Sequence, residues 1–246
     1  SAMCLKTLGF EVYEIPLQPD GQLDQTWLLE RVSDRTLLIS CMQVHNVVGT
    51  WFNLDVFSII KKRYPSIIIH SDCVQSFCKI PLPTSSQGVD LLSISAHKIH
   101  GPKGIGALIA TDPLFIRNGN LRGLCLGGGQ EHGLRSGTSS PALAQAFAQA
   151  AVWTASNQAS FSTGVETLRQ RLKQGLGPLL QSGTLTWVEA EQRIAHVVCL
   201  GVKAAPSKWV ASQLDRKGFG VSSGSACSSN KTATQDAMAL ALTQDP

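Results

Sequence analysis

Lys98 is the residue of this sequence whose surroundings best suit a nucleophilic amine. It closes the string Ser95-Ala96-His97-Lys98, which follows a largely apolar run, and a glycine-rich stretch (101–106) comes after it. This order predicts a strand, an exposed loop and a second strand. An amine beside a hydroxyl and an imidazole could form a Schiff base with a carbonyl compound. Because most lysines are solvated surface groups, this prediction depends on what the other predicted strand ends carry.

Polar side chains follow three predicted buried strands, at 36–44, 66–70 and 89–95. They are Asn46 after the first strand, Asp72 and Gln75 after the second, and Ser95, His97 and Lys98 at the end of the third. Ligands of open α/β sheets bind at the carboxyl ends of the strands, so these side chains can meet in one site. Asn46 could equally be a plain turn residue. That reading fits Asp72 less well, because it comes directly after a core strand.

These side-chain types match the needs of a pyridoxal phosphate enzyme. Such an enzyme supplies an amine for the aldehyde, a carboxylate for the pyridine nitrogen, hydrogen bonds to the ring oxygen and anchors for the phosphate. In that order, the candidates are Lys98, Asp72, Asn46 with Gln75, and Ser95 with His97. We therefore expect pyridoxal 5'-phosphate as the cofactor. We expect no metal site.

The elements that position these residues predict an α/β fold with a mainly parallel sheet, its strands buried on both faces. Further strands are predicted at 10–16, 105–110, 184–188 and 194–202, and helices at 23–33, 56–64, 142–153, 161–180 and 207–217. We expect a major domain over residues 1–155 and a smaller α+β domain over residues 156–246.

Composition excludes several classes of protein. The 246 residues are 43% hydrophobic and 15% charged, typical of a globular chain. A net charge of +4 without a basic stripe argues against a nucleic-acid partner. Seven cysteines without a CxxC motif argue against a disulfide framework and a zinc site, and favour a reducing, cytoplasmic location. Since no apolar run reaches 18 residues, we expect no membrane span.

Four strings and a supporting fifth are typical of one enzyme family. They are VHNVVG (44–49), HSDCVQS (70–76), SISAHKIHGPKGIGAL (93–108), GGGQEHGLRSGT (127–138) and SSGSACSS (222–229). From about residue 4 to residue 230 the chain resembles the cysteine desulfurases of the NifS/IscS kind, within the class V pyridoxal-phosphate aminotransferases. The resemblance implies the fold of the major domain of these transferases, followed by part of a small domain.

The resemblance also implies a role for each candidate. Lys98 would hold the cofactor covalently, Asp72 would pair with its pyridine nitrogen, and Asn46 and Gln75 would lie near the ring oxygen. Ser95 and His97 would hold the phosphate. Thr138 would reach the phosphate of a neighbouring subunit, which implies a homodimer.

Cys227, in the fifth string, matches the mobile catalytic cysteine of the family. By resemblance its thiolate attacks the sulfur of L-cysteine, alanine leaves, and a persulfide stays on the enzyme. The persulfide would then pass to a sulfur-acceptor protein, as in iron–sulfur cluster biogenesis.

The sequence departs from the family pattern in places. Position 47 is Val where an acidic residue is usual, position 73 is Cys where Ala is common, and no arginine follows Arg216 to bind the substrate carboxylate. The family's phosphate-binding turn and ring-stacking histidine precede the matched region, so we expect a chain truncated at both ends.

Two alternatives to the desulfurase therefore remain. One is a catalytically incompetent fragment that only dimerises or binds a partner. The other is a different class V enzyme, such as a selenocysteine lyase or an aminotransferase; the SSGSAC string favours the desulfurase.

Overall fold

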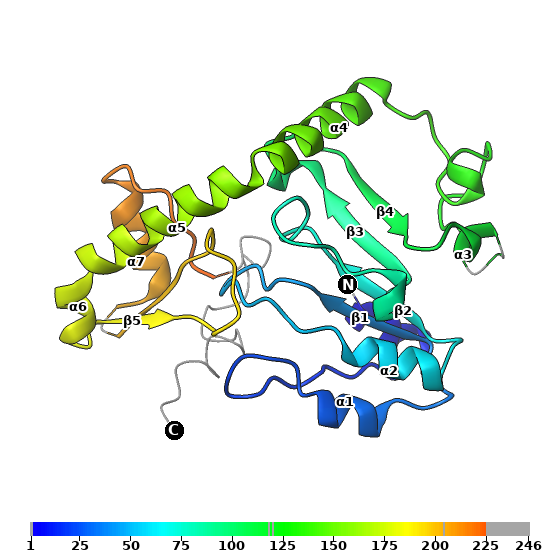
Figure 1. The fold of residues 1–246 in the computed structure, drawn as a ribbon, viewed down its shortest axis with the longest axis horizontal. Coiled ribbons are helices and arrows are strands. Elements are labelled where there is room, and N and C mark those ends of the chain that lie inside the picture. Colours follow the sequence, from blue (N-terminus) through cyan, green and yellow to red (C-terminus); the bar gives the residue numbers. More distant parts are fainter. Residues whose placement is uncertain (1, 118, 120, 204, 225–246) are drawn as a thin grey trace.

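Two β-sheets organise the chain in a computed structural model that describes residues 2–117, 119, 121–203 and 205–224 (Figure 1). A four-stranded sheet has the order β1-β2-β3-β4, and a two-stranded sheet pairs β5 with β6. The strands are β1 (Leu38–Met42), β2 (Ile68–Asp72), β3 (Leu91–Ser95), β4 (Gly106–Ala110), β5 (Leu185–Val188) and β6 (Cys199–Val202).

Helices connect and cover these strands. The α-helices are α1 (Gln25–Arg31), α2 (Val56–Arg63), α3 (Pro113–Arg117), α4 (Pro141–Ser156), α5 (Gln158–Gly175), α6 (Gly177–Gln181) and α7 (Ser207–Asp215). Short 3-10 helices are η1 (Ala2–Leu8), η2 (Ser85–Gln87), η3 (Ala96–Lys98) and η4 (Glu131–Gly133).

The larger sheet is mainly parallel, as the sequence predicts. β1 pairs with β2 in parallel, with Met42 opposite Asp72. β2 pairs with β3 in parallel, with Asp72 opposite Ser93, whereas β4 runs antiparallel to β3. The carboxyl ends of β1, β2 and β3 therefore lie along one edge of the sheet.

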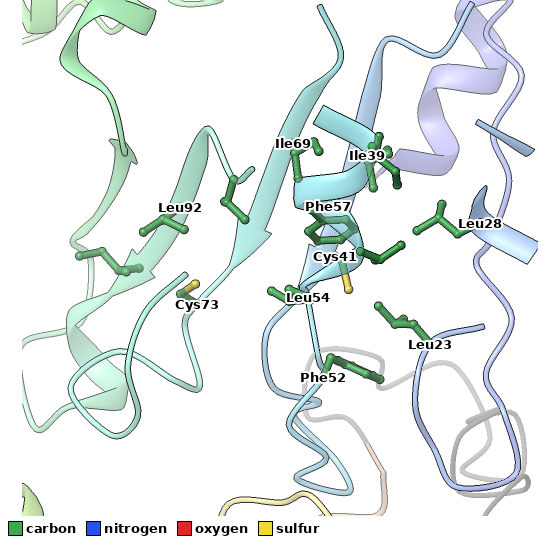
Figure 2. Packing of buried hydrophobic residues seen from close by; sticks show 14 of the residues in the cluster. Leu23, Leu28, Ile39, Cys41, Phe52, Leu54, Phe57, Ile69, Cys73 and Leu92 are labelled. Carbon is green, nitrogen blue, oxygen red and sulfur yellow. The ribbon is translucent and has the colours of Figure 1, made fainter. Parts of the chain in front are cut away.

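One face of this sheet forms the core. Ile39, Cys41 and Ile69 are buried on that face and belong to the same cluster as Phe57 and Ile60 of α2 (Figure 2). Phe57 is fully buried, and its ring lies among the side chains of the strands in Figure 2. Helix α2 thus holds β1 and β2 in place by apolar burial.

The opposite face is exposed over β1 and half-exposed over β2, so the prediction of strands buried on both faces is wrong for these two strands, whereas Leu91 and Leu92 of β3 are both buried. Leu38 is 47% exposed, Ser40 is exposed, and burial alternates along both β1 and β2. Successive side chains of a strand point to opposite faces, and helices cover only one of these faces here. The sequence could not reveal this difference, because Leu38 is as apolar as its buried neighbour Ile39.

Two further predictions differ from the structure. Residues 10–16 form no strand; the nearest pairing is an isolated bridge between Leu17 and Leu23. The predicted helix 161–180 is split at Leu176, with Pro178 in the first turn of the second piece, α6. A proline is tolerated in a first helical turn, where its missing N–H has no partner to lose.

The second sheet follows the long helices. β5 and β6 pair antiparallel, with Leu185 opposite Val202, and α6 leads directly into β5. The predicted domain boundary near residue 155 falls at the junction of α4 and α5, around Asn157. The division into two domains remains a prediction.

Candidate functional site

The polar side chains predicted to form a site follow the carboxyl ends of β1, β2 and β3. Just beyond those ends the backbones stay linked, because Gln43 N donates to Asp72 O and Cys73 N donates to Ser93 O, each at 2.9 Å. The candidates at this edge are Asn46 after β1, Asp72 and Gln75 at and after β2, and Ser95, His97 and Lys98 at and after β3. The strand order therefore brings six of the eight predicted residues to one edge.

Lys98 ends η3, a single turn that begins directly after β3. Ala96 is fully buried at the start of that turn, and its carbonyl accepts from the N–H groups of Ile99 and Gly101, both at 3.0 Å. The buried Thr154 of α4 donates its hydroxyl to the carbonyl of Ile99 at 3.1 Å. The turn is thus held by the core and by α4, while the Lys98 side chain remains exposed.

Ser95 and His97 form a hydroxyl–imidazole pair beside this amine. Ser95 Oγ lies 2.7 Å from His97 Nδ1. If the hydroxyl donates to Nδ1, the exposed ring presents Nε2–H to a ligand. Such a donor suits a phosphate oxygen.

Asp72 presents a carboxylate to solvent at the end of β2. Its Oδ1 accepts from Val74 N at 2.9 Å, which fixes the side chain in a tight turn. Gln75, three residues on, is half-buried in the same loop. An oriented carboxylate at this position can accept a hydrogen bond from a protonated pyridine nitrogen.

Asn46 lies in a compact loop between β1 and Trp51. The loop is closed by His45 N to Thr50 O and by Gly49 N to His45 O, each at 2.9 Å. Gly49 has φ +80, a conformation that side-chain-bearing residues rarely adopt, and a Cβ there would lie 3.0 Å from Val197 Cβ. The loop therefore needs glycine for its shape and for its contact with the segment around residue 197.

Two predicted residues do not join this edge. Thr138 is exposed in the segment that leads into α4, and Figure 1 places that segment beside α3, on the side away from the edge where β1 to β3 end. Cys227 lies outside the described residues.

Two residues near the edge were missed by sequence reasoning: Lys79 and His196. Burial and then the positive charge of Lys98 lower the pKa of Lys79 to about 8, and His196 lies in the segment whose Ile194 N donates to Gly49 O at 2.9 Å, beside the loop of Asn46. Lys79 follows Asp72 by seven residues in the same loop, so its closeness to Asp72 in the sequence could have identified it as a candidate. Nothing in the sequence indicated His196, because it reaches the site through a contact between distant segments.

The donor set fits pyridoxal phosphate. An exposed amine, a carboxylate and a hydroxyl–imidazole pair follow neighbouring strand ends, as this cofactor requires. No group of three or more His, Cys, Asp or Glu side chains in the described ranges is arranged to hold a metal ion. Among the described helices, none has both the length and the apolar character needed to span a bilayer.

Two relatives of similar sequence are named cysteine desulfurases. "Cysteine desulfurase, mitochondrial" of Candida albicans is 34% identical over 229 residues, which are 93% of this chain and 46% of that protein. "Cysteine desulfurase IscS" of Anaeromyxobacter sp. is 35% identical over 231 residues, 93% of this chain and 55% of that protein. The chain thus spans about half the length of these relatives.

A solved structure described as "NIFS-LIKE PROTEIN" superposes with a TM-score of 0.84 at 29% identity, covering 98% of this chain and 63% of that one. This confirms the predicted fold class: part of the pyridoxal-phosphate-dependent transferase fold, as found in NifS-like proteins. The family model for aminotransferase class-V matches residues 2–241. The chain therefore belongs to the aminotransferase class-V family, and within it to the NifS/IscS kind.

Proposed function

We propose that the protein carrying this chain is a pyridoxal-phosphate-dependent cysteine desulfurase. The observation that carries the proposal is the shared edge of β1, β2 and β3, where the exposed Lys98 amine follows β3 and the Asp72 carboxylate ends the neighbouring β2. The substrate is L-cysteine, and the products are alanine and a sulfur atom held by the enzyme.

Each residue of this edge binds a different part of the cofactor. When bound, pyridoxal phosphate supplies an electron sink that weakens the Cβ–S bond of the substrate. Lys98 holds the cofactor covalently, and Asp72 keeps the pyridine nitrogen protonated. Ser95 and His97 donate to the phosphate, while Asn46 and Gln75 lie near the ring oxygen.

Cys227 accepts the sulfur atom of the substrate. Its thiolate attacks the sulfur of L-cysteine, a new S–S bond forms, the Cβ–S bond breaks, and a proton returns to Cβ as alanine leaves. The balance is L-cysteine plus a thiol giving L-alanine plus a persulfide. Support for this role comes from the glycine- and serine-rich string around Cys227, which suits a carrier that must reach an acceptor.

The assembly is a homodimer in which Thr138 serves the partner's site. The position of the segment before α4, away from the site edge of its own chain, supports this assignment (Figure 1). The sulfur passes to an acceptor protein, for iron–sulfur cluster assembly. Six cysteines in the described ranges are free thiols, which supports a reducing compartment, the cytoplasm.

A visible spectrum tests cofactor binding. Adding pyridoxal phosphate to the purified protein should produce an absorbance band above about 400 nm, because the covalently held cofactor is a conjugated chromophore. Lys98→Ala should abolish the band, and the nearby Lys103→Ala should keep it. A band that survives Lys98→Ala would show that another amine holds the cofactor.

Sulfide release tests the reaction. Wild-type protein with L-cysteine and a reductant should release sulfide, and Cys227→Ala should keep the absorbance band but release none. A band without release in the wild type would favour the non-catalytic alternative. Release from selenocysteine alone would favour a selenocysteine lyase.

A further inference from the structure

Two residues in the loops that follow β2 and β3 have a backbone conformation that side chains disfavour. Cys78, in the loop after β2, has φ +60, and His100, two residues after Lys98, has φ +65. In this left-handed region the Cβ crowds the following carbonyl oxygen. A residue other than glycine stays there only where the surrounding structure holds it, so the contacts of these two side chains are informative.

One stretch of helix contacts both side chains. Cys78 Sγ donates to the carbonyl of Ala151 in α4 at 3.6 Å. The centroid of the His100 ring lies 5.8 Å from that of Trp153, near the end of α4, and 5.9 Å from that of Phe161, at the start of α5. Aromatic rings at this spacing attract each other. Both left-handed residues therefore use their side chains to contact the helices.

The backbone beside each of these residues is bonded to the same stretch. Thr154, buried in α4, donates its hydroxyl to the carbonyl of Ile99 at 3.1 Å. Gln158, at the start of α5, donates Nε2 to the carbonyl of Lys79 at 2.6 Å. Each carbonyl belongs to a direct neighbour of a left-handed residue. Since α4 and α5 follow one another as one long rod in Figure 1, a single element holds both loops.

These contacts connect the segment of the Lys98 amine to the segment of the Asp72 carboxylate. Lys98 and His100 belong to one turn, and Asp72 begins the loop that contains Cys78. A rigid ligand that binds both groups gains affinity when their spacing is fixed before it arrives. The helices are placed to fix that spacing.

We propose that residues 151–161, from the end of α4 to the start of α5, form a helix clamp that sets the spacing between Lys98 and Asp72, with His100 as a positioning residue. In this role His100 acts through the turn that carries Lys98, not on the cofactor itself. That the spacing serves pyridoxal phosphate rests on the proposed function, whereas the hold of the helix clamp on the turn does not.

Hydrogen exchange tests the helix clamp without any cofactor. Gly101 N donates to Ala96 O at 3.0 Å across the turn, so protection of the peptide that covers residues 96–101 reports whether the turn keeps its shape. His100→Ala removes the ring but keeps the cost of the left-handed φ, and it should lower this protection by about fivefold or more. His100→Tyr keeps a ring against the helices and should stay within about twofold of the wild type.

Two further variants separate the ring contact from the backbone strain. His100→Gly also loses the ring, but glycine adopts this φ freely, so protection should fall less than in His100→Ala. The matched control is His132→Ala, because His132 has φ +57 but lies in η4. It should leave the 96–101 peptide unchanged. Unchanged protection in His100→Ala, or an equal fall in His132→Ala, would overturn the proposal.

A comparison of two ligands tests the positioning role. Pyridoxal phosphate can bond to the Lys98 amine, whereas pyridoxine 5'-phosphate, with an alcohol in place of the aldehyde, cannot. His100→Ala should weaken the binding of pyridoxal phosphate by about tenfold and that of pyridoxine 5'-phosphate by less than about twofold, because only the first needs the amine in place. Equilibrium dialysis of the whole protein measures both. Equal losses would show a general structural defect, and the positioning role would be rejected.

The helix clamp and the proposed function can fail separately. If the wild-type protein forms no absorbance band with pyridoxal phosphate, the proposed function fails, while the exchange data still decide whether the helix clamp holds the turn. If the band forms but the 96–101 peptide exchanges equally in all variants, the helix clamp is rejected and the proposed function stands.

Discussion

His70 links three strands through its two ring nitrogens. Nδ1 lies 2.8 Å from Ser40 Oγ of β1, and Nε2 lies 2.7 Å from Ser93 Oγ of β3. The half-buried imidazole lies on the face of the sheet opposite to α2, two residues before Asp72. Burial lowers its pKa, and the nearby Asp72 carboxylate only partly opposes this effect. A neutral ring between two hydroxyls therefore helps to keep the strand ends in register.

This environment predicts that acid weakens the fold through His70. The unfolded chain takes up a proton near the ordinary histidine pKa of about 6.5, whereas the folded ring resists it, so stability is lost as pH falls through that value. The free energy of unfolding, measured in guanidinium chloride at pH 7.5 and 5.5, should fall less in His70→Gln than in the wild type. Equal falls in both proteins would contradict the assignment.

Ser93→Ala removes one of the two hydroxyl partners of the ring. At pH 7.5 it should lower the free energy of unfolding by about 1 kcal/mol, the usual contribution of one hydrogen bond. A variant as stable as the wild type would show that the hydrogen bond to β3 contributes little.

At the scale of elements, Glu189 fastens α5 to the second sheet. It follows β5 and accepts hydrogen bonds from Lys173 at 2.7 Å, from Trp187 Nε1 at 2.8 Å and from Arg169. Burial alone would raise its pKa, but the hydrogen bonds from Lys173, Arg169 and Trp187 outweigh burial and lower the pKa to about 2. Arg169 is only 3% exposed, so its buried positive charge needs this carboxylate to stabilise it.

Glu189→Gln should destabilise the fold by about 3 kcal/mol at pH 7, because it leaves a buried guanidinium without its counter-charge. The matched control is Glu166→Gln: this carboxylate pairs with Arg193 at 3.2 Å, and its side chain is 39% exposed. The control should cost less than about 1 kcal/mol, as exposed pairs do. Equal losses in the two variants would contradict the special role of Glu189.

The same carboxylate predicts a second acid transition. A depressed pKa stabilises the fold above the unfolded value, and this contribution is lost as pH falls from about 4.5 towards the folded value. Wild-type protein should therefore lose stability over this range, and Glu189→Gln should lose less. Denaturant midpoints measured from pH 5 to pH 3 provide the comparison.

At the scale of the whole molecule, large apolar side chains remain exposed in the segment before α4 and, separately, near the end of α4. Leu124 is 99% exposed and Leu126 is 78% exposed in the segment before α4, and Val152 and Trp153 on α4 are 63% and 51% exposed. Leu124 and Leu126 stand two positions apart in one segment, and exposed apolar groups of this size mark surfaces that bind other proteins. A homodimer through this region would cover them and bring the segment of Thr138 towards the partner's site.

Leu126→Asp should therefore weaken dimerisation by at least about tenfold, because it places a charge in an apolar interface. Sedimentation velocity over a range of protein concentrations measures the change. Leu168→Asp on α5, where the side chain is 64% exposed, is the control and should leave the dimer intact. A wild-type protein that stays monomeric at high concentration would remove the basis for Thr138 acting in a partner's site.

The positions of the strands and of the polar residues that follow them could be derived from the sequence alone. Apolar runs that end in turn-forming residues are local signals, so the ends of β1, β2 and β3 were predictable to within two or three residues, and with them Asn46, Asp72 and Lys98. The strand predicted at 10–16 rested on the same kind of local signal, and that prediction was wrong. Its alternation is real, but a strand forms only where a neighbour offers hydrogen bonds.

Only the tertiary structure decided which groups from distant parts of the sequence contact each other. The exposed face at Leu38 and Ser40, the contact of Ile194 with Gly49, and the burial of Arg169 beside Glu189 all depend on segments far apart in sequence. Apolar character and periodicity describe a residue and its near neighbours. Burial and charge coupling depend on which distant segment lies against it, and only the packed chain determines that.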